Sequence, residues 1–147
     1  MDAVPFHIGI ATDDLPTSMA AIGGALGVDW TTPSRGAGSF TDVHGHEQRR
    51  PQSCISLGSA VHIDLVQGDP GTLWLVETPR LHHLAYWTDD LPGDVERLGE
   101  QGWQLELSAT DERGTPTVFA YLIRDDGFRI ELIDAAGKDA YEARLSR

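Results

Sequence analysis

Apolar and polar positions alternate along two short segments of the chain, and each segment is followed by a stretch with helical periodicity. Phe6–Ala11 alternates as a strand with one buried face does. Residues 12–14 are typical of a helix N-terminus, and a glycine follows residue 26, which predicts a helix over about 15–26. The same signals recur later and predict a strand over 83–88 and a helix over 91–100.

Two stretches of sequence are repeated within the chain. Residues 7–15 and 83–91 share a histidine, a threonine, two aspartates and a leucine at matching positions. Residues 61–66 and 128–133 share an apolar alternation with an acidic residue at the fourth position. Two repeated segments that occur in the same order indicate that one structural unit is duplicated.

Short strands are expected after each helix. In the second unit they lie near 104–107, 117–123 and 128–134, and in the first unit 53–57 and 61–67 are the clearest. Neither unit could bury one face of its sheet alone. The predicted fold is therefore α+β, with two tandem βαβββ modules that form one cup-shaped, partly open barrel with the helices outside.

The domain organisation follows from the repeat. The prediction is a single domain over 1–147, with module one over about 5–68, a linker over about 69–80, module two over about 81–135 and a tail over 136–147. Thr31–Gln52 is rich in small, polar and charged residues and is predicted to be a mobile loop or lid. Gly137–Arg147 is predicted to be a polar tail with weak helical character.

Four ionisable residues share one face of the predicted strands. Because strand side chains alternate, His7, Asp64, His83 and Glu131 all lie opposite the residues that would pack on the helices. A lone strand histidine or carboxylate is more often packed or exposed, but four in paired repeat positions would be costly to bury without a partner. A divalent cation removes that cost, so the pattern predicts a metal site with these four residues as ligands.

Composition excludes several other functions. The chain has 23 Asp and Glu against 11 Lys and Arg, which disfavours binding to nucleic acid. It has no apolar run long enough to span a bilayer, so no membrane association is expected. Cys54 is the single cysteine, which excludes an internal disulfide, fits a cytoplasmic location and, in its apolar setting, favours a packed thiol.

The repeated motifs resemble those of the vicinal oxygen chelate superfamily, which includes glyoxalase I, methylmalonyl-CoA epimerase, extradiol dioxygenases and bleomycin-resistance proteins. The resemblance covers about residues 5–135. It rests on His-Ile-Gly-Ile-Ala-Thr-Asp-Asp-Leu from His7, Leu26-Gly27, Ile-Asp-Leu, His-His-Leu-Ala and Ile-Glu-Leu. It implies paired βαβββ modules with a metal held by residues from both, and it is nearest to the epimerase-like branch through His7 and His82-His83.

The resemblance also implies roles for individual residues. The family's first, third and last metal ligands fall on His7, His83 and Glu131. Its second ligand is usually Glu or Gln, whereas this chain has Asp64, which is one methylene shorter. In the epimerases a glutamate before the third strand is a catalytic base, and Glu47 takes that place here, although an exposed loop glutamate explains the residue equally well.

The function implied is that of a metal-dependent epimerase, isomerase or lyase that removes a proton next to a chelated carbonyl. Its cofactor would be one divalent metal ion, Zn, Ni, Co, Mn or Fe. Glu131 would carry the proton, with Glu47 as its partner on the opposite side. A small, ring-containing substrate would contact four further residues on the inner face: Trp87, Phe119, Tyr121 and His62.

Two other functions stay open on sequence grounds. An iron-dependent extradiol dioxygenase needs only two histidines and one glutamate, and the extra Asp64 argues against it. A metal-free binding protein of the bleomycin-resistance type would lack a full ligand set. The expected partners are a small-molecule substrate and a second copy of the chain in a homodimer.

Overall fold

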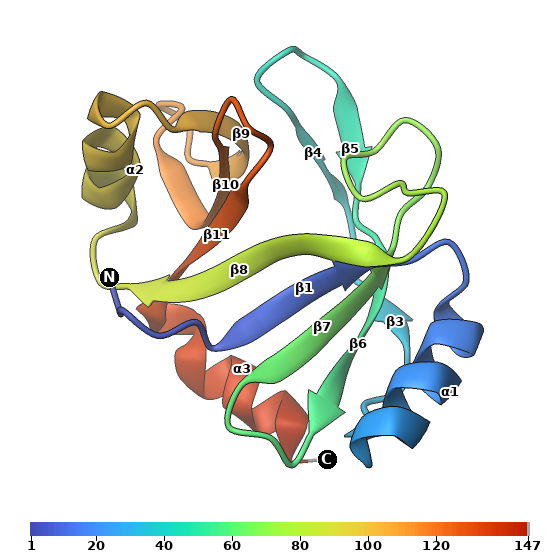
Figure 1. Cartoon of the computed structure of the whole chain (residues 1–147). Helices are drawn as coiled ribbons and strands as arrows, with labels where there is room; N and C mark the ends of the chain where they lie inside the picture. Colours follow the sequence, from blue (N-terminus) through green and yellow to red (C-terminus); the bar gives the residue numbers. More distant parts are fainter. Residues whose placement is uncertain (147) are drawn as a thin grey trace.

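A curved mixed sheet forms the body of the protein, and helices cover both of its faces (Figure 1). A computed structural model describes residues 1–146. The helices are α1 (Leu15–Leu26), α2 (Leu91–Glu100), a 3-10 turn η1 (Ala135–Gly137) and α3 (Lys138–Leu145). The strands are β1 (His7–Ala11), β2 (Asp29–Trp30), β3 (Ser34–Arg35), β4 (Ser39–Thr41), β5 (Glu47–Arg49), β6 (Gln52–Leu57), β7 (His62–Gln67), β8 (Arg80–Thr88), β9 (Gln104–Thr110), β10 (Pro116–Ile123) and β11 (Arg129–Asp134).

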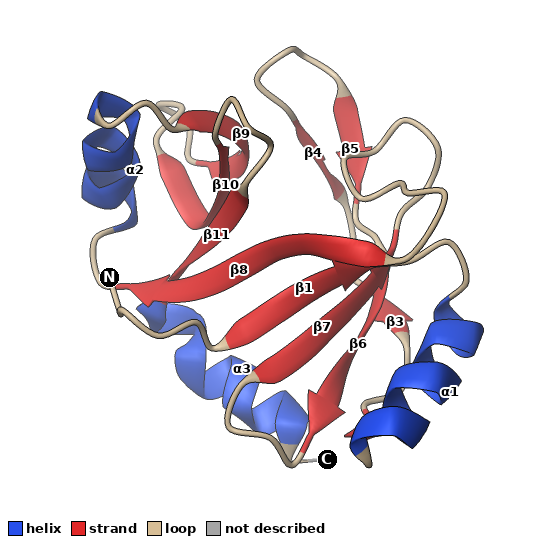
Figure 2. Ribbon diagram, viewed as in Figure 1, coloured by secondary structure: helices blue, strands red, loops and turns tan. Residues whose placement is uncertain are grey.

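The sheet has two halves with the same strand arrangement. Its order is β2-β6-β7-β1-β8-β11-β10-β9, with β3 also paired to β6. β1 and β8 are antiparallel neighbours at the centre, and each has a parallel partner on its outer side, β7 beside β1 and β11 beside β8. The sheet curves strongly without closing into a barrel (Figure 2). The predicted α+β fold of two paired units is confirmed.

α1 and α2 pack on the outer face of the sheet, one on each half. Under α1, Leu15 packs with Cys54 and Leu65, and burial raises the pKa of the Cys54 thiol to about 12, so this cysteine is a packed, unreactive group. Under α2, Leu91 and Leu98 join a separate buried cluster with residues of β10 and β11. None of the helices within residues 1–146 has the length and apolar character needed to cross a membrane.

The repeated Thr-x-Asp motif begins both outer helices. The Asp14 carboxylate accepts from the Thr17 N–H at 3.1 Å, and the Asp90 carboxylate accepts from the Gly93 N–H at the same distance. In each copy the threonine hydroxyl accepts from the N–H of the capping aspartate. The shared Thr and Asp residues are therefore helix caps and take no part in the metal group.

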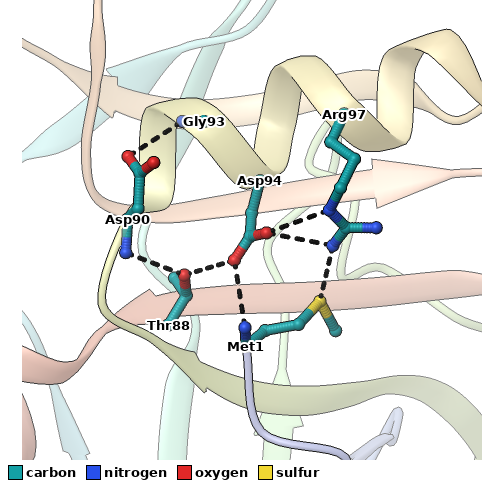
Figure 3. A network of polar contacts seen from close by, with 6 residues as sticks. All are labelled: Met1, Thr88, Asp90, Gly93, Asp94 and Arg97. Atoms are coloured by element: carbon teal, nitrogen blue, oxygen red, sulfur yellow. Dashed lines mark hydrogen bonds and ion pairs between the residues drawn. The ribbon is translucent and has the colours of Figure 1, made fainter.

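The cap of α2 extends into a polar network that reaches the first residue of the chain (Figure 3). Thr88 donates to the Asp94 carboxylate, which also contacts the Met1 amino group at 3.4 Å and the Arg97 guanidinium at 3.0 Å. Asp94 lies in the first turn of α2, where a negative charge also stabilises the helix dipole. The network attaches the segment before β1 to the second half of the sheet.

Thr31–Gln52, predicted to be a mobile loop or lid, contains β3 and the hairpin β4–β5, so it is not a continuous loop, while its mobility stays a prediction. The turn of the hairpin is held by Asp42, whose side chain accepts from the N–H groups of His44 and His46 at 2.9 Å. Gln48 is buried and donates to Asp42 at 3.0 Å. Short polar strands of this kind lack an apolar alternation and so resemble a loop in sequence.

The C-terminal segment forms a helix on the inner face, which we define as the sheet face that carries His7 and His83. In Figure 1, α3 lies behind the strands while α1 lies in front of them. Tyr141 of α3 packs edge-on against Phe6 and Trp87, with ring centres 5.2 and 5.6 Å apart. The prediction of weak helical character is confirmed by α3, which ends at Leu145. Arg147 lies outside the described residues, and the prediction that the helices lie outside does not hold for α3.

β10 carries a bulge next to the inner face, and Val118 within it has a positive φ of 65°. A β-branched residue in this region is strained by about 1 to 3 kcal/mol. Because Val118 is exposed, Val118→Asn is expected to stabilise the protein by about 1 kcal/mol, or about 2 to 4 °C in thermal unfolding. Val118→Thr keeps the branching and should give no gain. An equal gain in both variants would show that strain is not the cause.

Candidate metal centre

Strand register brings the four predicted ligands to the middle of the inner face. Across the sheet, His7 of β1 and Glu131 of β11 both lie opposite Ala85 of β8. In the neighbouring row, Asp64 of β7 and His83 of β8 both lie opposite Gly9 of β1. In each row, two predicted ligands from opposite halves of the sheet therefore flank a small residue, which is Ala85 in the first row and Gly9 in the second.

Three of these side chains converge on one point. The Nε2 atoms of His7 and His83 are 3.0 Å apart, and Glu131 Oε2 is 3.3 Å from the first and 3.1 Å from the second. Atoms that bind one metal at about 2.1 Å lie about 3.0 Å apart at neighbouring octahedral positions and about 3.4 Å apart in a tetrahedron. The spacing of the three donor atoms therefore fits one divalent cation. We call His7, His83 and Glu131 the metal group.

Gly9 makes room for the imidazole of His83. A Cβ atom at position 9 would lie 2.0 Å from Cε1 of that ring. The imidazole ring of His83 occupies the space that a side chain at position 9 would need. Only a residue without a side chain fits here, because His83 is almost fully buried and cannot move into solvent.

In the metal group, two imidazole nitrogens and a carboxylate oxygen face one another at short distances, so a positive charge between them is favourable. Burial alone would lower the pKa of His7, but its hydrogen bond to Glu131 and the charges of Asp64 and Glu131 outweigh burial and raise that pKa above 6.5. Burial opposes ionisation of Glu131, yet its hydrogen bonds to His7 and His83 lower its pKa to about 2. These interactions favour a proton on His7 in the metal-free protein, and a metal ion would replace that proton.

A chain of hydrogen bonds sets the tautomer of His83. His82 Nε2 lies 2.9 Å from the Leu73 carbonyl, which can only accept, so this nitrogen carries a hydrogen. Burial and the charge of Arg129 lower the pKa of His82 to about 3, so its Nδ1 has no hydrogen and accepts from His83 Nδ1 at 2.9 Å. His83 therefore presents the lone pair of its Nε2 to the metal group, as a metal-binding histidine must.

His82→Gln is expected to weaken metal binding by about 10- to 100-fold, since it replaces the fixed ring nitrogen that orients His83 with a flexible amide. Metal titration of the purified variant with a competing chelator measures the effect. His62→Gln is the matched control, because His62 Nδ1 also contacts a backbone carbonyl, that of Ser56 at 2.8 Å, but lies outside the metal group. Equal metal affinity in wild type and His82→Gln would refute this role.

Asp64 lies beside the metal group without joining it. Its Oδ2 is 3.7 Å from His7 Nε2, and the group of donor atoms found within 4.8 Å of one another among residues 1–146 contains only His7, His83 and Glu131. Burial raises the pKa of the Asp64 carboxyl, although the charges of both histidines oppose the increase. A partly exposed carboxylate that holds its proton more strongly than usual is suited to accept a proton from a ligand.

A cavity of about 410 Å³ opens over the metal group. His7, Asp64 and Glu131 line one side of it, and Phe119 and Tyr121 of β10 line another. Two predicted substrate-binding residues are therefore at the cavity. The Tyr121 hydroxyl accepts a hydrogen bond from Trp74 Nε1 at 3.3 Å.

Three other predicted site residues lie elsewhere. Trp87 and His62 line a separate hollow beside α3, and the Trp87 ring stacks on Phe6 with the ring centres 4.0 Å apart. Glu47 is exposed on β5 and does not line the cavity, whereas its neighbour Gln48 points inward. Because successive strand side chains face opposite sides, Glu47 faces away from the metal group.

Sequence reasoning missed two features of the site. The adjacency of His82 and His83 in the sequence was the only signal of the hydrogen bond between them. Tyr141 and Arg144 of α3 line the cavity, but their polar, weakly helical segment gave no sign that it packs on the inner face.

Metal affinity is expected to fall as the pH is lowered. The raised pKa of His7 means that a proton competes with the metal already above pH 6.5, and each further pH unit should cost about tenfold in affinity. Glu131 stays ionised over this range because its pKa is about 2. Competition titrations between about pH 8.5 and 6 measure the slope. An affinity that does not change over this interval would contradict the assignment of His7.

The fold is shared with known enzymes. Methylmalonyl-CoA epimerase from Mycobacterium tuberculosis is similar with 24% identity over 96% of this chain and 97% of that chain, at a TM-score of 0.61. A variant of Streptomyces coelicolor methylmalonyl-CoA epimerase in complex with 2-nitronate-propionyl-CoA has 17% identity over 88% and 95%, at 0.59. A variant of 4-hydroxymandelate synthase from Streptomyces coelicolor has 15% identity over 89% of this chain and 47% of that chain, at 0.62.

Structural similarity at sequence identities this low establishes only the shared fold. The family is identified from the amino-acid sequence. No curated protein matches the chain significantly. The family model for the glyoxalase/bleomycin resistance protein/dioxygenase superfamily matches residues 6–121, which is most of the chain and includes β1, β7 and β8. The chain therefore belongs to the glyoxalase/bleomycin resistance protein/dioxygenase superfamily.

Proposed function

We propose that the protein is a divalent-metal-dependent isomerase, epimerase or lyase that removes a proton next to a chelated carbonyl. The observation that carries the proposal is the placement of Asp64 beside the metal group. The donor atoms of that group are 3.0 to 3.3 Å apart, and a second carboxylate, that of Asp64, lies 3.7 Å from His7 Nε2 in the same cavity. A metal-binding triad and a separate proton acceptor are the two parts that this chemistry requires.

The donors in the metal group suit a divalent metal. Two imidazoles and one carboxylate are ligands common to Zn, Mn, Co, Ni and Fe sites. His7, His83 and Glu131 would hold the ion against the sheet, with its remaining positions facing the cavity. A metal there would polarise a carbonyl that binds through two adjacent oxygens and so make the neighbouring C–H more acidic.

We assign the proton transfer to Asp64. Its Oδ2 is in the cavity, and burial raises its pKa toward the range in which a carboxylate accepts and returns a proton. Glu131, which the sequence suggested as the proton carrier, contacts both histidines and is better placed to hold the metal. Glu47 has no step in this proposal because it is exposed on β5.

The residues that line the cavity favour a substrate with an apolar part. Phe40, Phe119, Val118 and Ile133 line the space beyond the metal group. The Phe40 and Phe119 rings meet edge-on with their centres 4.8 Å apart. A small substrate could therefore bind its oxygens at the metal group and place a chain or ring against these side chains.

Hydrogen exchange tests the proposal without requiring that the product be known. The metal-loaded protein is incubated in D₂O with 2-oxo acids and with methylmalonyl-CoA, and loss of the proton next to the carbonyl is followed by NMR. We expect exchange at least about 100-fold faster than with chelator-treated protein. Exchange with every compound no faster than in buffer containing the same metal would count against proton abstraction.

An iron-dependent oxygenase is the second candidate. Two histidines and one carboxylate with open positions are typical of non-haem Fe(II) oxygenases, and the metal group has this composition without Asp64. Oxygen uptake by the ferrous-loaded protein in the presence of catechols tests this candidate. The proton-abstraction proposal expects no uptake above that of ferrous iron alone.

A further inference from the structure

The cavity over the metal group concentrates positive charge in an acidic chain. The sequence has a net charge of −12 and 11 Lys and Arg residues, of which Arg35, Arg50 and Arg144 line this cavity. Arginine binds carboxylates and phosphates through paired N–H donors. The cavity is therefore suited to a ligand that carries a negative charge.

The three arginines differ in whether the protein already uses their donors. Arg35 donates to both carboxylate oxygens of Asp69, at 2.9 and 3.1 Å. Arg50 donates Nε to a backbone carbonyl of the preceding loop, and its guanidinium lies 4.4 Å from the centre of the Phe40 ring. Arg144 makes no ion pair and no side-chain hydrogen bond within residues 1–146 and still lines the cavity. Its donors are the most available to a ligand.

Tyr141 presents a second unused donor on the same side of α3. Its hydroxyl is buried and has no hydrogen-bond partner within the described residues. Residues three apart share a helix face, and both Tyr141 and Arg144 line the cavity. A buried hydroxyl without a partner is costly, so an anionic oxygen bound at Arg144 would also give this hydroxyl an acceptor.

We propose that Arg144 and Tyr141 form a subsite for a second carboxylate of the substrate on the α3 side of the cavity, where the Tyr141 ring centre is 6.2 Å from that of His7. This inference rests on the proposed function, because it places the other end of the substrate at His7, His83 and Glu131. The substrate is then a dicarboxylic acid. One end supplies the adjacent chelating oxygens, the other end supplies the carboxylate, and the short carbon chain between them contacts apolar residues of β10 such as Phe119.

Matched ligands separate this subsite from the metal group. Zinc-loaded protein is titrated calorimetrically with 2-oxoglutarate and with 2-oxopentanoate, which share the chelating end and chain length and differ only in the terminal carboxylate. The comparison is repeated with pairs of 2-oxo acids whose carbon chains are one atom shorter and one atom longer. We expect at least one dicarboxylate to bind about tenfold or more tightly than its partner, as charge-assisted hydrogen bonds allow.

Variants assign that preference to individual residues. Arg144→Gln should reduce the preference to within about twofold and leave the affinity for 2-oxopentanoate unchanged. Tyr141→Phe should reduce it by a smaller factor, because it removes one neutral donor. Arg124→Gln is the matched control, since Arg124 contacts Asp126 at 3.0 Å on the surface away from the cavity, and it should keep the full preference.

Three results would overturn the inference. The first is equal binding of every pair of ligands by the wild-type protein. The second is a preference that Arg144→Gln keeps and Arg50→Gln loses. The third is competition by free coenzyme A that depends on Arg144, which would make the bound anion a phosphate. The metal content of each sample is measured as well. A preference for dicarboxylates in protein that binds no metal would support the subsite and refute the metal proposal. Bound metal without a preference for dicarboxylates would refute the subsite alone.

Discussion

Replacing Asp64 with asparagine is expected to slow hydrogen exchange by about 100- to 10,000-fold, which is the range that a positioned general base contributes. The amide has nearly the same shape as the carboxylate but cannot accept the proton. Because Asp64 lies outside the metal group but its charge acts on His7, the affinity of Asp64→Asn for zinc should fall by less than the roughly tenfold expected for a lost ligand. NMR exchange and chelator competition on the same preparation give both values.

The same variant tests the role that the sequence suggested for Asp64. A metal ligand would lose about tenfold or more in metal affinity when its charge is removed. Asp29→Asn is the matched control, since Asp29 is an exposed carboxylate on β2 and should change neither value. Full exchange activity in Asp64→Asn would exclude this residue as the base, and a large loss of metal affinity would identify it as a fourth ligand.

Gly9→Ala is expected to weaken metal binding by about 10- to 100-fold, although Gly9 itself offers no ligand. The new Cβ would lie 2.0 Å from Cε1 of His83, so the ring must move. Such overpacking costs about 1 to 3 kcal/mol, and a shifted His83 would break its contacts with His82 and Glu131 together. Zinc titration and thermal unfolding separate the effect on the site from the effect on the fold.

Gly24→Ala provides the control for Gly9→Ala. Gly24 lies within α1, and a Cβ added there meets no atom within 4 Å. The same substitution should therefore leave metal affinity unchanged and raise stability by about 0.5 to 1 kcal/mol through helix propensity. Wild-type metal affinity in Gly9→Ala would show that the packing of His83 on Gly9 does not position this ligand.

The repeat and the strand alternation predicted the parts of the site that depend on backbone geometry. Because His7 and His83 lie in equivalent strands, the alternation of strand side chains predicts that they share a face. The second repeated segment, which pairs residues 61–66 with 128–133, predicts the same face for Glu131. The register of β1 with β8 then explains why the two histidines meet at the centre of the sheet. These features are local consequences of sequence, and the structure confirms the fold that they predict.

Other features depend on details that sequence patterns do not encode. Whether the Asp64 carboxylate reaches the metal group depends on a difference of about one methylene in side-chain length, since its Oδ2 lies 3.7 Å from His7 Nε2. Glu47 was placed by counting residues back from a strand, and a shift of one position turns a strand side chain to the opposite face. α3 packs through Tyr141 against rings from distant parts of the chain, a tertiary contact without a periodic signal.

Stoichiometry of bound metal decides whether His7, His83 and Glu131 form a metal site. The protein is purified without chelators, analysed by elemental mass spectrometry, and then stripped and titrated with zinc and cobalt. We expect one ion per chain and tight rebinding in wild type, with both lost in Glu131→Ala. A chain that carries no metal, rebinds none and shows no thermal shift with Zn, Ni, Co or Mn would contradict the metal site and favour a metal-free binding protein.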